Sequence, residues 1–412
     1  MNNREGSAAF VAPLLVLALG HMISNLLRTL PAISADVLAR DIGTTPEGLA
    51  SLTGAYHLTF AMGQIPLGVA LDRFGVKPVA LVLLGVVTLA AAASAMVGGP
   101  VGFLLTQVAL GLGSCGALLC PMTLAAKILS PAKFGLWSGL IQGTGNVGML
   151  LSASPLAWVV ENSGWRTGFW VAAGLALVVA LLVARLVPAP VPAAMPPGPR
   201  PSLLAEAREV VRLGLSRRLR GLVMLAFASF AVIIGLRGLW GGPWLMDIKG
   251  LSRIEAGNLL LVFTLALIGG AMLSGMLDRI LGHRRLLLIL GHAGASACLL
   301  LVVAGGPGGW ISMALGLPML PASYDAVMFL AFGLAIAVQP LAFAMTRAAV
   351  PPEQAGKALS AVNLSFFLGT AVLQAASGPV AAAWGIGAAL VFLAVANLVC
   401  TGFFVVSSRK AG

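Results

Sequence analysis

Two arginines, Arg28 and Arg237, interrupt long apolar runs and are the residues of this chain best placed to do chemistry. Each is followed, at a similar separation, by an Asp-Arg pair, so the two halves of the chain repeat one plan. A guanidinium stays charged in proteins and is costly in hydrocarbon, which predicts that the two arginines share a polar cavity that attracts anions. The alternative is that each arginine snorkels from the outer end of its helix, since Arg28 lies close to Pro31.

Other strong hydrogen-bonding side chains within apolar runs are candidates for completing this cavity. Asn25 and His21 fall on the same helical face as Arg28. The remaining candidates for substrate contact are Tyr56, His57, Gln142, Trp240 and Asn363. Proton coupling needs a group that titrates near neutral pH, for which His57 is the first candidate and His21 the second. The alternative for each histidine and amide is a hydrogen bond between helices without any ligand.

The elements that must position these residues are membrane-spanning helices. Of the 412 residues, 59% are hydrophobic and 9% are charged, which excludes an ordinary soluble domain. Apolar runs of about 20 residues, the length that crosses a bilayer, predict an all-α membrane protein with twelve transmembrane helices. The runs lie at 9–30, 47–71, 76–97, 101–126, 134–160, 167–187, 219–243, 254–277, 284–304, 324–348, 356–382 and 386–407.

The distribution of charge predicts topology and excludes one class of partner. Most Lys and Arg fall on the side of the membrane that also holds both termini, which places the termini in the cytoplasm and the chain in the cell inner membrane. This asymmetry accounts for the net charge of +12, so no nucleic-acid partner is expected. Residues 1–187 and 219–412 are expected to form two pseudo-symmetric six-helix bundles, joined by a cytoplasmic linker at 188–218.

Around the first Asp-Arg pair the chain resembles the loop motif of the major facilitator superfamily. Gly68, Asp72, Arg73 and Lys77 match its glycine, acid and basic positions, and Asp278 with Arg279 resembles its echo in the second half. The resemblance implies the major facilitator fold and a gating role for those residues. The alternative is that the pairs only solvate turns and fix topology. Val76 departs from the loop motif, and in the fourth expected span Gln107 stands where many members of the superfamily carry an arginine.

Arginines in the first and seventh spans resemble the organic-anion and organophosphate branches of that superfamily. The resemblance implies that Arg28 and Arg237 hold a carboxylate or phosphate, while Gln142 and Asn363 hold hydroxyls. The expected protein is a secondary transporter for a small organic anion, with a proton as its coupling ion. It is expected to be a monomer and to have no enzymatic activity, metal or cofactor.

Three other substrates remain as alternatives. Met272 and Met276 are soft ligands at helical spacing, which suits Cu(I) import. The glycine-rich stretch 143–148 resembles that of nitrate porters. Efflux of a neutral solute or drug is the third alternative. The thirteen Asp and Glu fall in loops or at span ends, which disfavours a cationic drug.

Overall fold

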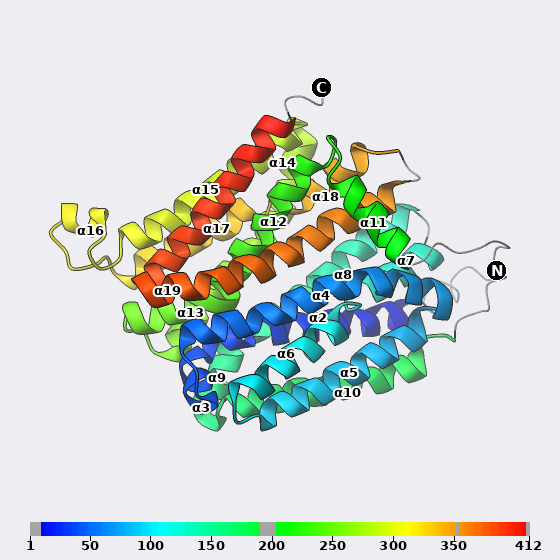
Figure 1. Cartoon of the computed structure of the whole chain (residues 1–412), viewed down its shortest axis with the longest axis horizontal. Coiled ribbons are helices and arrows are strands. Elements are labelled where there is room, and N and C mark those ends of the chain that lie inside the picture. The colour runs from blue at the N-terminus through cyan, green and yellow to red at the C-terminus, as the bar shows by residue number, and fades with distance from the viewer. Residues whose placement is uncertain (1–9, 130, 190–202, 352–353, 409–412) are drawn as a thin grey trace.

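The computed structural model describes residues 10–129, 131–189, 203–351 and 354–408, and the chain is helical almost throughout (Figure 1). The first half contains α2 (Val11–Ile33), α3 (Ala35–Ile42), α4 (Pro46–Phe74), α5 (Val76–Met96), α6 (Pro100–Ser114), α7 (Leu119–Ile128), α8 (Pro131–Leu151), α9 (Ser154–Ser163) and α10 (Trp165–Leu186). Helix α11 (Leu203–Gly214) lies within the expected linker, 188–218. The second half contains α12 (Arg220–Gly235), η1 (Leu236–Trp240), α13 (Gly241–Pro243), η2 (Trp244–Ile248), α14 (Arg253–Leu281), α15 (Arg284–Ala304), α16 (Trp310–Ala314), α17 (Ala322–Ile336), α18 (Pro340–Ala348) and α19 (Ala355–Ser408).

Nine helical segments in the described part of the chain are long and apolar enough to cross a membrane. The longest, Gly356–Ser408, contains two helices, because Gly385 takes a left-handed φ of 84° and turns the chain. Helix α4, and α8 with α9, occupy the places of two further expected spans. The protein is therefore an all-α membrane protein, while the count of twelve spans stays a prediction.

Three expected spans are broken rather than continuous. The runs at 101–126, 134–160 and 324–348 are interrupted between α6 and α7, α8 and α9, and α17 and α18. Pro121, Pro155 and Pro340 follow these breaks, and proline both lacks an N–H and clashes with the carbonyl one turn earlier. The expected span at 219–243 also differs, because it continues to Ile248 and its second half is π-helical at η1 and η2. π-Helical turns are rare and gather at functional sites.

The two halves of the chain pack as two bundles along a shared seam. Helices α2 to α6 and α10 lie together below α12, α15, α17 and α19 in Figure 1, with α4 side by side with α19. Glycines permit the closest approach near the end that carries α3, which we call the α3 end. A Cβ on Gly378 would lie 2.4 Å from the Glu47 carbonyl oxygen, and one on Gly242 would lie 2.2 Å from that of Ala32. The bundles are therefore tightly sealed at the α3 end.

Candidate functional site

Arg28 lies in the seam between the bundles and is 7% exposed. Its guanidinium donates to Asn25 Oδ1 at 3.1 Å and to Ser24 Oγ at 3.4 Å, both on its own helix α2. Its Nε has no hydrogen-bond partner among the described residues. This position contradicts the snorkelling alternative, because a snorkelling side chain would reach the exposed end of its helix.

Aromatic rings surround the Arg28 guanidinium. The guanidinium carbon lies 5.8 Å from the ring centroid of Tyr56, 5.2 Å from that of Phe60, 5.3 Å from that of Phe230 and 5.2 Å from that of Phe367. Helix α4 supplies the first two rings, and α12 and α19 supply the others, so both bundles contribute. We call these four residues the aromatic cage. The surroundings of the Arg28 guanidinium are thus largely aromatic, and cation–π contacts partly replace the lost solvation of the charge.

The phenylalanines of the aromatic cage could not be predicted from the sequence because they stand in apolar runs. In such runs the sequence does not distinguish a phenylalanine that faces lipid from one that belongs to a site. The Phe60 and Phe367 rings are stacked with centroids 3.9 Å apart, although the residues belong to different halves of the chain. No local spacing in the sequence signals such a pairing.

Arg237 is fully buried in the π-helical η1 and joins three helices. It donates to Thr264 Oγ1 at 3.0 Å, to the Met149 carbonyl at 2.5 Å and to Ser152 Oγ at 3.0 Å. The Met149 carbonyl lies in the last turn of α8, where the break before α9 leaves carbonyls without helical partners. Arg237 therefore caps a helix of the opposite bundle, although its Nη1 remains without a partner among the described residues.

The other predicted contact residues divide into several groups. Asn25 bonds to Arg28, and the Tyr56 hydroxyl lies 3.0 Å from Ser24 Oγ, so both belong to the Arg28 cluster. Gln142 pairs with His21 at 3.1 Å, as the interhelical alternative for His21 expected.

Two further contact residues lie in α19 and η1. The Asn363 amide donates to Gln64 Oε1 at 3.3 Å and so bridges the bundles. Trp240 is fully buried, and its indole N–H donates to Ser377 Oγ at 2.9 Å, which leaves it no free polar atom.

His57 is the predicted residue with the least satisfied side chain. It is 2% exposed, and neither ring nitrogen has a hydrogen-bond partner among the described residues. The Gln374 amide of α19 lies beside the imidazole, and among the described residues its oxygen makes no hydrogen bond of ordinary geometry. Gln374 was not among the residues predicted from the sequence, although an amide within an apolar run was itself the available signal.

The predicted gating residues make no described contact with the opposite bundle. Asp278 accepts from Arg284 Nε at 2.9 and 2.8 Å within its own half, and Arg279 is exposed. The Arg73 guanidinium lies 5.1 Å from the Phe74 ring centroid. Gly68 is exposed and Lys77 is half-buried, while the side chain of Asp72 lies outside what the structure describes. A gating role for these residues stays a prediction.

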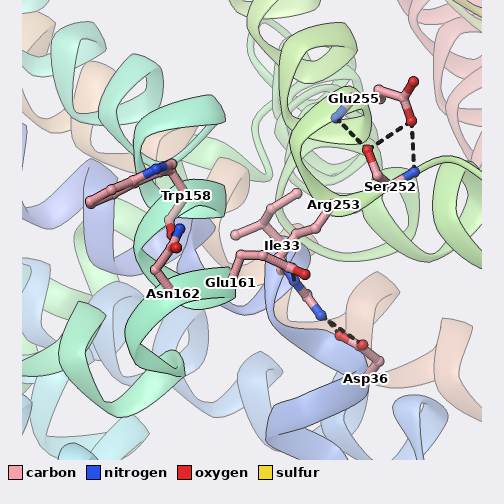
Figure 2. Close-up of polar contacts among 8 residues, drawn as sticks. All are labelled: Ile33, Asp36, Trp158, Glu161, Asn162, Ser252, Arg253 and Glu255. Atoms are coloured by element: carbon pink, nitrogen blue, oxygen red, sulfur yellow. Dashed lines mark hydrogen bonds and ion pairs between the residues drawn. The ribbon is translucent and has the colours of Figure 1, made fainter.

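Charged contacts between the bundles occur instead at the α3 end, around Arg253 (Figure 2). Its guanidinium donates to Asp36 Oδ1 at 2.9 Å and Oδ2 at 2.8 Å, to Glu161 Oε2 at 3.2 Å and to the Ile33 carbonyl. We call these four residues the Arg253 latch. Partial burial alone would raise the pKa of the Asp36 carboxyl, but the hydrogen bonds and charge of Arg253 outweigh burial and lower it.

The Arg253 latch was missed because Arg253 had been assigned only to membrane topology. The sequence signal for its position was Ser252 followed by Glu255, a spacing typical of a capping box at a helix N-terminus. In the structure these two residues form that capping box, so Arg253 is the first residue of α14.

One acidic residue at a span end is buried, which its position in the sequence did not indicate. Asp325 stands at the start of α17, near the end of a span as expected, but it is fully buried. It pairs with Lys249 at 2.9 Å and accepts from the Trp244 indole at 2.8 Å. Burial is tolerated because the carboxylate has a charged partner and a hydrogen-bond donor.

These features define a helical membrane protein with two bundles, a charged aromatic centre and an ionic closure at one end. A family profile, the Major Facilitator Superfamily, matches residues 17–320, and the chain belongs to this family. The resemblance found in the loop motif is therefore confirmed at the level of the superfamily.

Curated relatives are similar over part of their length. The chain is 27% identical to the putative niacin/nicotinamide transporter NiaP of Bacillus subtilis over 61% of this chain and 63% of that protein. It is also 27% identical to the tetracenomycin C resistance and export protein of Streptomyces glaucescens, over 60% of this chain and 42% of that protein. The match thus spans less than two thirds of each of these relatives.

Solved structures share the fold along nearly the whole chain. A D-xylose–proton symporter superposes with a TM-score of 0.74 at 16% identity and covers 96% of this chain and 97% of its own. A POT family transporter in complex with 5-aminolevulinic acid gives a TM-score of 0.78 at 12% identity, with 97% and 96% covered. At these identities the likeness shows the fold alone.

Proposed function

We propose that the protein is a secondary active transporter that moves a small organic anion across the cell inner membrane by alternating access. The single observation that carries this proposal is Arg28, a buried cation between the bundles that no described carboxylate neutralises. A buried charge without a counter-ion is unfavourable, so an anionic ligand is the partner that completes the site. Both termini lie in the cytoplasm in this proposal, and the coupling ion is a proton.

The aromatic cage narrows the class of anion to carboxylates with a planar or apolar body. Guanidinium binds a carboxylate through two parallel hydrogen bonds, and aromatic faces stack on planar groups. Three relatives have names that include a carboxylate: the putative niacin/nicotinamide transporter of Bacillus subtilis, the niacin transporter of Acinetobacter baylyi and the probable sulfoacetate transporter of Cupriavidus necator. The first name also includes nicotinamide, a neutral amide. Sugar acids and organophosphates remain the neighbouring classes to test.

Export of an antibiotic is the second candidate. The relatives from Streptomyces glaucescens and Bacillus subtilis that are named for resistance to tetracenomycin C and methylenomycin A favour it. Copper import has less support, because Met272 and Met276 are exposed at 72% and 60% rather than gathered in the seam.

Flux through the purified protein in proteoliposomes distinguishes these candidates. We expect labelled nicotinate or benzoate to accumulate under an inward proton gradient and to be competed by other carboxylates. Protein-free liposomes and liposomes with Arg28→Gln protein are the controls. Transport of neutral antibiotics with no movement or competition by any organic anion would contradict the proposal.

A further inference from the structure

The α4–α19 seam shows an ordered change of side chains along its length. Near the α3 end the helices touch at glycine, where a Cβ on Gly54 would lie 3.2 Å from the Ala371 carbonyl oxygen. Farther along lies the stacked pair Phe60 and Phe367, and beyond it the amide pair of Gln64 and Asn363. On α4, His57 lies between the glycine contact and the stacked pair, and on α19 Gln374 lies beside the glycine contact, next to Ala375.

His57 and Gln374 are buried polar residues on the two facing helices of this seam. His57 is 2% exposed and Gln374 is 1% exposed, and three of their polar atoms make no hydrogen bond of ordinary geometry within the described part of the chain. Buried polar atoms are almost always paired, because an unpaired one loses its hydrogen bonds to water without replacement. Three such atoms on two facing helices therefore require an explanation.

His57 adjoins the aromatic cage that holds Arg28. The His57 ring lies 5.2 Å from the Tyr56 ring by centroid, and the Arg28 guanidinium carbon lies 5.8 Å from the centroid of the same Tyr56 ring. A ligand whose carboxylate is held by Arg28 would thus bring its other end to His57 and to its neighbour Gln374.

We propose that His57 and Gln374 form a second subsite, which binds a hydroxyl or amide group on the substrate remote from its carboxylate. A neutral imidazole offers one donor and one acceptor, and the amide oxygen offers another acceptor. A hydroxyl can accept from the imidazole N–H and donate to the amide oxygen at once, which a plain hydrocarbon end cannot do. The inference rests on the proposed anion transport and adds the class of substrate, a carboxylate with a distal hydrogen-bonding group.

Binding of a substrate at this subsite would also change the conformational equilibrium of the transporter. His57 belongs to the first bundle and Gln374 to the second, so a group bonded to both stabilises the arrangement in which the two helices are close. A ligand shifts a conformational equilibrium only by its differential affinity for the two states. A substrate with the distal group would therefore favour the state closed at the α3 end more than one without it.

Binding of matched carboxylates to the purified full-length protein tests the inference. Benzoate is compared with 3-hydroxybenzoate and 4-hydroxybenzoate by calorimetry, on the natural protein and on His57→Leu and Gln374→Leu. We expect at least one hydroxybenzoate to bind the natural protein roughly 10-fold more tightly than benzoate, since one or two hydrogen bonds are gained. In either variant that preference should fall to near one.

One set of controls distinguishes a binding role of His57 and Gln374 from a purely structural role. A second comparison distinguishes failure of the subsite from failure of the proposed anion transport. His292→Leu removes a buried histidine whose two ring nitrogens are both bonded, so it should lower the melting temperature and keep the preference. His57→Leu and Gln374→Leu should not lower the melting temperature of the unliganded protein, because few bonds are lost. Equal affinity for benzoate and both hydroxybenzoates in the natural protein would overturn the subsite alone. Absence of binding by all three would overturn the proposed function with it.

Discussion

Arg28 and Arg237 stand at similar places in the two halves of the chain, yet their environments differ. Arg28 faces four aromatic rings, and its Nε has no partner among the described residues, whereas Arg237 bonds to a carbonyl and two hydroxyls. The sequence could predict that both would be costly to bury. It could not predict which would be satisfied by protein, because the Met149 carbonyl becomes available only through the break in α8.

Replacement of Arg237 should therefore act mainly on stability. In Arg237→Gln the Met149 carbonyl and Ser152 lose their donor, which should lower the free energy of unfolding by about 1–3 kcal/mol. Arg237→Lys should be intermediate, because an ammonium cannot reproduce the guanidinium fork. Thermal unfolding of the purified variants checks this, with Arg73→Gln, an exposed arginine, as the control. A melting temperature as high as that of the natural protein would show that the cap contributes nothing.

Among the elements, apolar runs predicted most helices, but their breaks and pairings depend on tertiary contacts. Pro155 stands in the last third of its expected span, 134–160. Hydropathy alone does not distinguish two helices separated at a proline from a single kinked helix. The π-helical η1 leaves no pattern in the sequence. The α3 to α14 contact joins residues from different halves, so the Arg253 latch became visible only in the structure.

Loss of the Arg253 latch should favour opening at the α3 end. In Arg253→Gln the Asp36 and Glu161 carboxylates lose their cation, so a cysteine placed at Ser154, near the seam at this end, should be labelled more quickly by a membrane-impermeant thiol reagent. Arg166→Gln, which breaks a pair with Asp41 inside one bundle, is the matched control. Equal labelling rates in both variants would mean that the latch does not hold the closed state.

The pH dependence of the latch follows from Asp36. Because Arg253 lowers the Asp36 pKa, the contribution of this pair is complete above the usual aspartate pKa and is lost as the pH falls through the lowered value. Labelling of the same cysteine should therefore stay constant from about pH 8 to pH 5 once corrected for thiol ionisation, with aspartate normally titrating near 3.9. A marked rise in labelling within that range would assign control of this end to another group.

At the scale of the whole molecule, the two bundles could be predicted because the two halves of the sequence repeat one pattern. Which end of the seam between the bundles is closed could not be predicted. The described bundle contacts close the α3 end, while Asp278 pairs within its own half. If the loop motif latches the opposite end in the alternate state, Asp278→Asn should slow transport several-fold and leave substrate affinity within a few fold. Asp72→Asn should slow it more, because the first motif is more complete. Normal initial rates in proteoliposomes for both variants would remove the gating role.

The central claim is that Arg28 binds the carboxylate of the substrate inside the aromatic cage. Calorimetric titration of benzoate or nicotinate into the natural protein, Arg28→Gln and Arg28→Lys measures this directly, with Arg73→Gln as the control for charge. A desolvated, charge-assisted hydrogen bond contributes about 1.5–3 kcal/mol, so Arg28→Gln should weaken binding by roughly 10- to 150-fold and Arg28→Lys by less. Arg73→Gln should bind as the natural protein does. An Arg28→Gln protein that is folded and binds these carboxylates with unchanged affinity would contradict the claim.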